Sequence, residues 1–129
     1  MNNLLQPPAH PPTEEIFEKI ISCGEVRIER IVSFGHKSPD DFWYDQHENE
    51  WVAVLEGDAT IEFDDGEQTR LSRGEHCFIT ARRKHRVIST CENSATIWLA
   101  VFFPAGNNPV DTESNPVDTE SNPVETEST

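Results

Sequence analysis

The stretch Asp45-Gln-His-Glu-Asn-Glu-Trp-Val-Ala-Val-Leu-Glu-Gly57 decides the fold. Its second half contains the apolar, β-prone run Trp51 to Leu55, which Gly57 brings to an end. The chain then resumes as Ala59 to Phe63, so the pattern predicts a β-hairpin. The first half offers four side chains that can bind a metal ion, namely Asp45, His47, Glu48 and Glu50. The sequence therefore predicts liganding residues at the start of a stiff strand.

Short β-prone runs separated by turn signals continue on both sides of this hairpin. Turns are predicted at residues 64–67 and 73–75, each with a central glycine. The further strands are predicted at residues 26–34, 68–71, 77–80, 86–90 and 95–103. About eight short strands with almost no helix are typical of an all-β sandwich or barrel. Residues 95–103 are apolar on both faces, so this strand is expected to be central or covered by a partner chain.

Residues 13–23 predict a short N-terminal helix. Thr13 is a plausible N-cap, and Ile16, Phe17, Ile20 and Ile21 recur at helical spacing. Gly24 follows as a helix-ending residue. An edge strand is the alternative interpretation.

The two ends of the chain differ in composition from the middle. Residues 1–12 contain four prolines and predict a flexible segment. Pro104-Ala105-Gly106 ends the predicted domain, which spans residues 13–106. From Asn108 the unit Asn-Pro-Val-Asp-Thr-Glu-Ser repeats, and its prolines exclude a coiled coil. Residues 107–129 are therefore predicted to be a disordered acidic tail.

The composition limits the classes of function. The chain has 129 residues, a net charge of −14 and 35% hydrophobic residues, with no apolar run long enough to cross a membrane. The negative charge argues against nucleic acid as a partner, and neither a phosphate-loop motif nor a hydrolase nucleophile motif is present. We expect a cytoplasmic protein, because no secretory signal is visible and the three cysteines lack metal-type spacing. The basic run at residues 82–86 could attract an anionic substrate or form a solvated loop.

Two spaced residue pairs, Glu50 with Gly57 and Gly74 with His85, resemble the two motifs of the cupin family. Members of that family are small jelly-roll barrels (double-stranded β-helices) with metal ligands inside the barrel. In the first motif, Glu50 and Gly57 match a glutamate followed by a glycine. The two histidine positions before that glutamate fall on Tyr44 and Gln46, or on Trp43 and Asp45. In the second motif Gly74 and His85 match, whereas the proline, glycine and asparagine positions hold Thr80, Arg82 and Ser89. The resemblance covers roughly residues 26–103 and implies an all-β cupin barrel.

The resemblance implies a site for a divalent transition metal such as Mn, Fe, Ni or Zn. Glu50 and His85 would supply two ligands, and Asp45 or His47 could supply a third. In this picture a small-molecule ligand would contact Tyr44 and Trp43, together with Arg82 or Arg86. The reaction implied is an isomerisation, a lyase step or a dioxygenation. The alternative is a cupin without metal or catalysis that binds a ligand or simply dimerises.

Apolar surface at two places predicts self-association. One is the strand at residues 95–103, and the other is the aromatic pair Phe42 and Trp43. Exposed apolar patches of this kind are usually covered, most often in a two-fold dimer. We therefore expect a homodimer.

Overall fold

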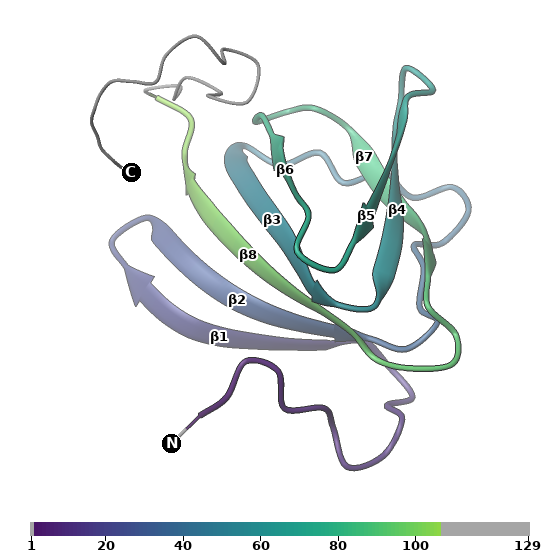
Figure 1. Cartoon of the computed structure of the whole chain (residues 1–129). Coiled ribbons are helices and arrows are strands. Elements are labelled where there is room, and N and C mark those ends of the chain that lie inside the picture. Colours follow the sequence, from purple (N-terminus) through teal and green to yellow (C-terminus); the bar gives the residue numbers. More distant parts are fainter. Residues whose placement is uncertain (1, 107–129) are drawn as a thin grey trace, which may run out of the picture.

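The computed structural model describes residues 2–106, which form eight antiparallel strands (Figure 1). The strands are β1 (Ile16–Cys23), β2 (Val26–Ser33), β3 (Glu48–Glu56), β4 (Asp58–Phe63), β5 (Gln68–Ser72), β6 (His76–Ile79), β7 (His85–Thr90) and β8 (Thr96–Pro104). Within the described range there is no α-helix, and hence none with the length and apolar character to cross a bilayer. The prediction of an all-β jelly roll is confirmed.

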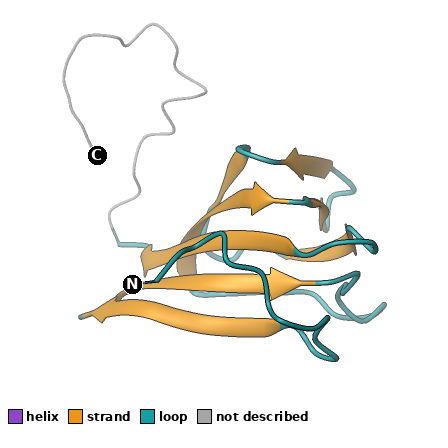
Figure 2. Cartoon of the chain, turned by 60° about the horizontal axis from the view of Figure 1, so that its bottom comes forward, coloured by secondary structure: helices purple, strands orange, loops and turns teal. Residues whose placement is uncertain are grey.

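The strands build two sheets that face each other. One sheet has the order β1-β2-β8-β3-β6, and the other has the order β5-β4-β7. Figure 2 shows the long strands of the larger sheet with the short strands of the smaller sheet above them. The β-hairpin predicted around Gly57 is wrong, because β3 pairs with β6 and β8 whereas β4 pairs with β5 and β7 in the other sheet. The turn at Gly57 is instead a corner of the barrel, where the chain passes from the larger sheet to the smaller one.

The hydrophobic core fills the space between the sheets. Its buried members come from both inner faces, as alternation along strands requires. They include Val52, Val54, Ala59, Ile61, Phe63, Leu71, Ile79, Trp98, Ala100 and Phe102. Strand β8 lies between β2 and β3, so its two apolar faces reflect a central position, one of the two predicted alternatives.

The predicted helix at residues 13–23 is wrong, because this segment contains strand β1 at the edge of the larger sheet. A bulge between Lys19 and Ile21 breaks the alternation of the strand, which accounts for apolar residues at helix-like spacing. Gly24 has a φ of 59° and sits in the tight turn to β2. A left-handed glycine suits a hairpin turn as well as a helix end, so this signal is ambiguous. A helix this short gains little stability by itself, whereas pairing with β2 satisfies the backbone.

Arg30 ties the N-terminal segment to the barrel. Its guanidinium donates to the backbone oxygens of Leu4 and Gln6 and pairs with Glu18 at 2.8 Å. Figure 1 shows the segment running beside β1. The flexibility expected for residues 1–12 stays a prediction, and the acidic tail predicted at residues 107–129 lies outside the described residues.

Candidate functional site

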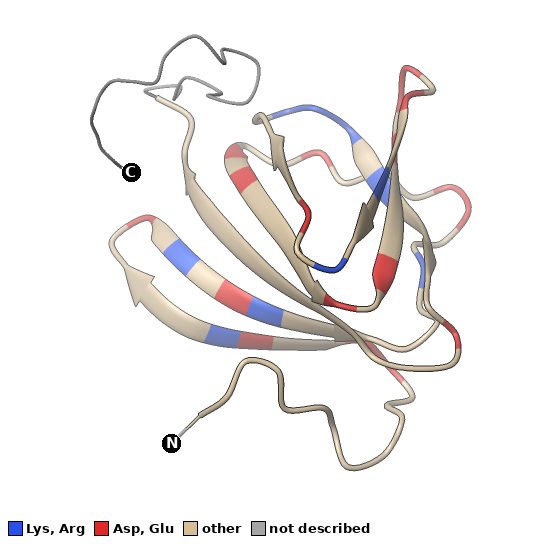
Figure 3. Ribbon diagram, in the orientation of Figure 1, with Lys and Arg blue, Asp and Glu red and all other residues tan. Residues whose placement is uncertain are grey.

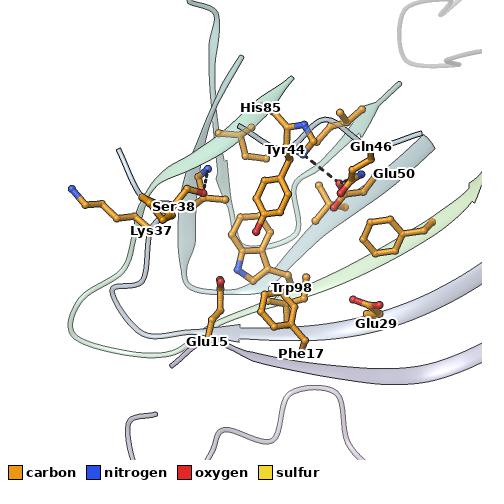
Figure 4. A pocket seen from close by; sticks show the side chains of 17 residues that line it. Glu15, Phe17, Glu29, Lys37, Ser38, Tyr44, Gln46, Glu50, His85 and Trp98 are labelled. Carbon is orange, nitrogen blue, oxygen red and sulfur yellow. Dashed lines mark hydrogen bonds and ion pairs between the residues drawn. The ribbon is translucent and has the colours of Figure 1, made fainter. Parts of the chain in front are cut away.

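A cavity of about 160 Å³ lies inside the barrel (Figure 4). Its apolar wall includes the rings of Phe17, Tyr44, Trp98 and Phe102. Polar side chains also reach it, among them Glu15, Glu29, Ser38, Gln46, Glu50 and His85. A mostly apolar pocket with a few converging polar groups is the usual form of a small-molecule site.

The segment between β2 and β3 forms one wall of the cavity, because it pairs with β7 like a short extra strand. Tyr44 and His85 exchange two backbone hydrogen bonds of 2.7 and 3.1 Å. Ser38 accepts a bond from the Val87 backbone with its hydroxyl, at 3.0 Å, and donates its own backbone N–H to the Val87 carbonyl, at 2.8 Å. Gln46 is held by a 2.7 Å bond from the Arg82 backbone to its carbonyl. These bonds fix Tyr44 and Gln46 against the cavity.

Glu50 and His85 form the buried polar centre of the cavity. Glu50 comes from β3 and is 8% exposed, and His85 begins β7 and is 5% exposed. The Glu50 Oε1 atom lies 3.5 Å from His85 Nε2. The Gln46 side-chain amide donates to the same Glu50 oxygen at 3.3 Å. Two residues 35 positions apart in the sequence thus meet inside the barrel.

The hydrogen bonds of His85 fix which ring nitrogen carries a proton. Its Nδ1 atom lies 2.8 Å from the backbone oxygen of Arg83, and a carbonyl oxygen can only accept. The Nδ1 atom therefore holds a hydrogen, and a neutral ring points the lone pair of Nε2 at the Glu50 carboxylate. Two acceptors that face each other in a buried place need a proton, a donor or a cation between them. A backbone carbonyl that orients an imidazole in this way is also typical of metal-binding histidines.

Tyr44 covers the imidazole of His85. The two rings stack with centroids 5.4 Å apart and planes inclined by 24°. Burial raises the pKa of Tyr44 above its usual value, and the negative charges of Glu15 and Glu50 raise it further. The phenol is therefore neutral at physiological pH, and its hydroxyl is available as a hydrogen-bond donor.

Asp45 and His47 lie at the surface, away from Glu50 and His85. Alternation along the segment turns Tyr44 and Gln46 to the cavity and the intervening residues outward. Asp45 instead pairs with Arg82 at 3.3 Å. His47 is exposed beside a separate pocket that also includes Arg27. Of the four predicted metal ligands, the fold brings together Glu50 and His85.

The other predicted ligand-contact residues, apart from Tyr44, hold parts of the fold together. Arg86 pairs with Glu62 at 2.8 Å, and its guanidinium lies 4.3 Å from the centre of the Trp43 ring. Arg83 and Arg82 likewise pair with carboxylates, namely those of Glu67 and Asp45. Figure 3 shows this basic run entering β7 with acidic positions nearby. These ion pairs neutralise Arg82, Arg83 and Arg86, as expected for the solvated loop that was one of the two interpretations of residues 82–86.

Glu50 and His85 are two strong donors, fewer than a resident transition ion usually has. Glu50 Oε1 and His85 Nε2 lie as far apart as two donors on one ion would, since bonds of about 2.1 Å at a tetrahedral angle separate donors by about 3.4 Å. The Gln46 amide could add an oxygen, because its oxygen and nitrogen are assigned from the hydrogen-bond network. Across residues 2–106, no three His, Cys, Asp or Glu side chains come together to bind a metal. Resident transition ions in proteins usually have three or four protein ligands.

The motif spacing in the sequence predicts some of the residues of this site but not all of them. Motif spacing gave Gln46 as one of two candidates for a ligand position, and the structure favours the pair Tyr44 and Gln46 over Trp43 and Asp45. Glu15 and Trp98 were missed as cavity residues. Glu15 lies in the wrongly predicted helix, and Trp98 lies in the apolar strand predicted at residues 95–103. No sequence signal marks either residue as part of a site.

Comparison with known proteins identifies the family. The Cupin domain family matches residues 32–102, and the chain belongs to the cupin family. A crystal structure from Ralstonia eutropha JMP134, whose assignment as a mannose-6-phosphate isomerase is provisional, is 35% identical with a TM-score of 0.78 and covers 81% of this chain and 98% of that one. A search of the curated proteins found no match.

Two more distant structures show the same fold. A cupin superfamily protein from Desulfitobacterium hafniense DCB-2 is 14% identical with a TM-score of 0.60, and the match covers 71% of this chain and 79% of that one. The iron(II) form of HppE is 17% identical with a TM-score of 0.59, and the match covers 69% of this chain and 50% of that one. At this level of identity the likeness concerns the fold alone.

Proposed function

We propose that this chain binds a small polar molecule in the barrel cavity, with Glu50 and His85 holding an exchangeable divalent ion at its polar end. The observation that carries the proposal is the buried approach of Glu50 Oε1 and His85 Nε2 to 3.5 Å, which is about the separation of two donors on one ion. A buried carboxylate is stabilised by a nearby positive charge, whether a proton or a metal ion supplies it. A ligand or ion that carries positive charge is therefore stabilised when it binds between Glu50 and His85.

Each residue around the pair has a part in this function. Gln46 orients the carboxylate of Glu50, and the Arg83 carbonyl keeps the Nδ1 proton of His85 in place. Tyr44 excludes water from the imidazole and offers its hydroxyl to a bound molecule. A divalent ion, when bound, would act as a Lewis acid that polarises an oxygen of the ligand. This arrangement suits an isomerase or lyase acting on a hydroxylated or carbonyl compound.

The related Ralstonia structure raises the question of a phosphorylated ligand. A phosphate group is normally held by arginine, lysine or a helix N-terminus. Lys37 is the one lysine or arginine among the residues that line the cavity, and Figure 4 shows its ammonium turned away from the centre. The cavity therefore favours a ligand without a phosphate group.

We expect Glu50→Gln and His85→Ala each to weaken binding of Mn²⁺ at least 10-fold, because each removes one of two strong donors. His47→Ala is the matched control, since it deletes an imidazole outside the cavity and should leave the Kd unchanged. Calorimetric titration of the untagged proteins reads out all three. Binding that weakens with His47→Ala and survives the other two changes would contradict the proposed site.

We also propose that the chain forms a homodimer through the edge of the larger sheet. Within residues 2–106 the outer edge of strand β1 has no pairing strand, and its side chains Phe17 and Ile21 are 56% and 54% exposed. Apolar side chains on an open edge favour pairing with a second copy. Light scattering should give twice the chain mass of 14.6 kDa for the wild type, and Ile21→Lys should shift it to one chain. A monomeric wild type at micromolar concentration would refute this assembly.

A further inference from the structure

The end of the cavity opposite the Glu50–His85 pair contains a carboxylate fixed among aromatic rings. Figure 4 shows Glu15 reaching up towards Tyr44 and Trp98, with Phe17 beside them and Glu50 on the far side of Tyr44. All four of these neighbours line the same cavity as Glu15. Glu15 precedes β1, so the segment leading into the edge strand positions it.

A buried relay of hydrogen bonds holds the Glu15 carboxylate in one orientation. The Trp98 Nε1–H donates to the Ser33 hydroxyl oxygen at 3.1 Å, and that hydroxyl donates its own hydrogen to Glu15 Oε2. Ser33 is completely buried, and Trp98 is 4% exposed. The bond to Ser33 engages one carboxylate oxygen and leaves Oε1 for another donor. The Glu15 carboxylate is therefore preorganised, and it needs little rearrangement when a ligand binds.

The charge of Glu15 is not neutralised by the protein in the described structure. No lysine or arginine within residues 2–106 forms an ion pair with it. Glu29, a further carboxylate at the cavity wall, differs because it pairs with Arg27 at 2.9 Å. A lone carboxylate beside aromatic faces attracts a cation twice, by its charge and through the quadrupole of the rings.

From this geometry we infer an ammonium-binding subsite, in which Glu15 and the rings of Tyr44 and Trp98 hold the cationic group of a small organic amine. The inference rests on the proposed function, because it assigns the ligand class of the same cavity. The amine end of the ligand lies at Glu15, and its polar oxygen end reaches towards Glu50 and His85.

Choline and its uncharged isostere 3,3-dimethylbutan-1-ol test this subsite, because they share a shape and differ in charge. We expect calorimetry on the full chain to give choline a Kd at least 10-fold lower than that of the isostere. Glu15→Gln should raise the Kd of choline at least 10-fold and leave that of the isostere unchanged. Glu25→Gln removes the same charge from the exposed β1–β2 turn and is the control, with no change expected.

Equal affinities for the two probes, no binding of choline, or no effect of Glu15→Gln would each overturn the subsite. Mn²⁺ titration of the Glu15→Gln protein separates this failure from failure of the proposed function, because Glu15 is not one of the proposed metal donors. Suppose that choline and its isostere bind with equal affinity while Mn²⁺ binding still depends on Glu50 and His85. That result would refute the ammonium subsite and leave the proposed metal site supported.

Discussion

Replacing Gly57 by alanine is expected to destabilise the protein by about 2–5 kcal/mol. A Cβ atom at this position would lie 2.5 Å from Thr96 Oγ1, 2.8 Å from the Thr96 Cα and 2.9 Å from the Ala95 oxygen. Two of these neighbours are backbone atoms, so they cannot move aside without shifting the start of β8. Gly57 also has a φ of 83°, which costs an alanine about 1–2 kcal/mol, and overpacking adds about 1–3 kcal/mol.

Gly66→Ala separates the two contributions. Gly66 has a φ of 93°, yet a Cβ there would meet nothing within 4 Å. This variant should therefore lose only the conformational part, about 1–2 kcal/mol. Urea unfolding of both variants measures the difference. If Gly57→Ala is no less stable than Gly66→Ala, the close approach of the barrel corner to Thr96 is not real.

The second large effect concerns the Glu50–His85 pair in protein stripped of metal. His85→Ala should lower the free energy of unfolding by about 3–5 kcal/mol, because removing one partner of a buried pair strands the other in the barrel. Glu50→Gln keeps the shape and supplies an amide that can donate to His85, so its cost should be smaller. The double variant Glu50→Gln/His85→Ala should be more stable than His85→Ala alone, since the stranded charge is gone.

Denaturant unfolding of the four proteins completes a double-mutant cycle and isolates the interaction of the two side chains. We expect them to be coupled by at least about 1 kcal/mol, as is usual for contacting residues in a buried network. Strictly additive losses would mean that the 3.5 Å approach carries no energetic interaction.

The two strands on either side of Gly57 show why the strands could be predicted from sequence but their pairing could not, since β3 and β4 lie in different sheets. The apolar run of β3, the glycine and the alternating β4 are local signals, and each agrees with the final structure. The prediction of a helix at residues 13–23 was also wrong for a local reason. The bulge in β1 gives its apolar residues a helix-like spacing, and Gly24 is compatible with a helix end and with a hairpin turn. The hydrophobic periodicity of one segment does not reveal a β-bulge, because a bulge depends on how the strand pairs with its partner.

The site was harder to predict because its parts come from distant places in the chain. Motif spacing linked Glu50 to His85, and the fold brings the two together. Asp45 and His47 were proposed as metal ligands. Side chains alternate along this segment, and the face that meets the cavity holds Tyr44 and Gln46 instead. Glu15 reaches the cavity through a hydrogen-bond relay across three segments, and no pattern in one segment can reveal such a relay.

Anomalous diffraction from crystals grown with Mn²⁺ tests the proposed centre most directly. A divalent ion bound by the Glu50 carboxylate and the Nε2 atom of His85 would give an anomalous peak inside the barrel, within about 2.2 Å of both donors. We predict this peak in the wild type and its loss in Glu50→Gln. A map that is empty between the two side chains at saturating Mn²⁺, or a peak at His47 or Asp45 instead, would contradict the account.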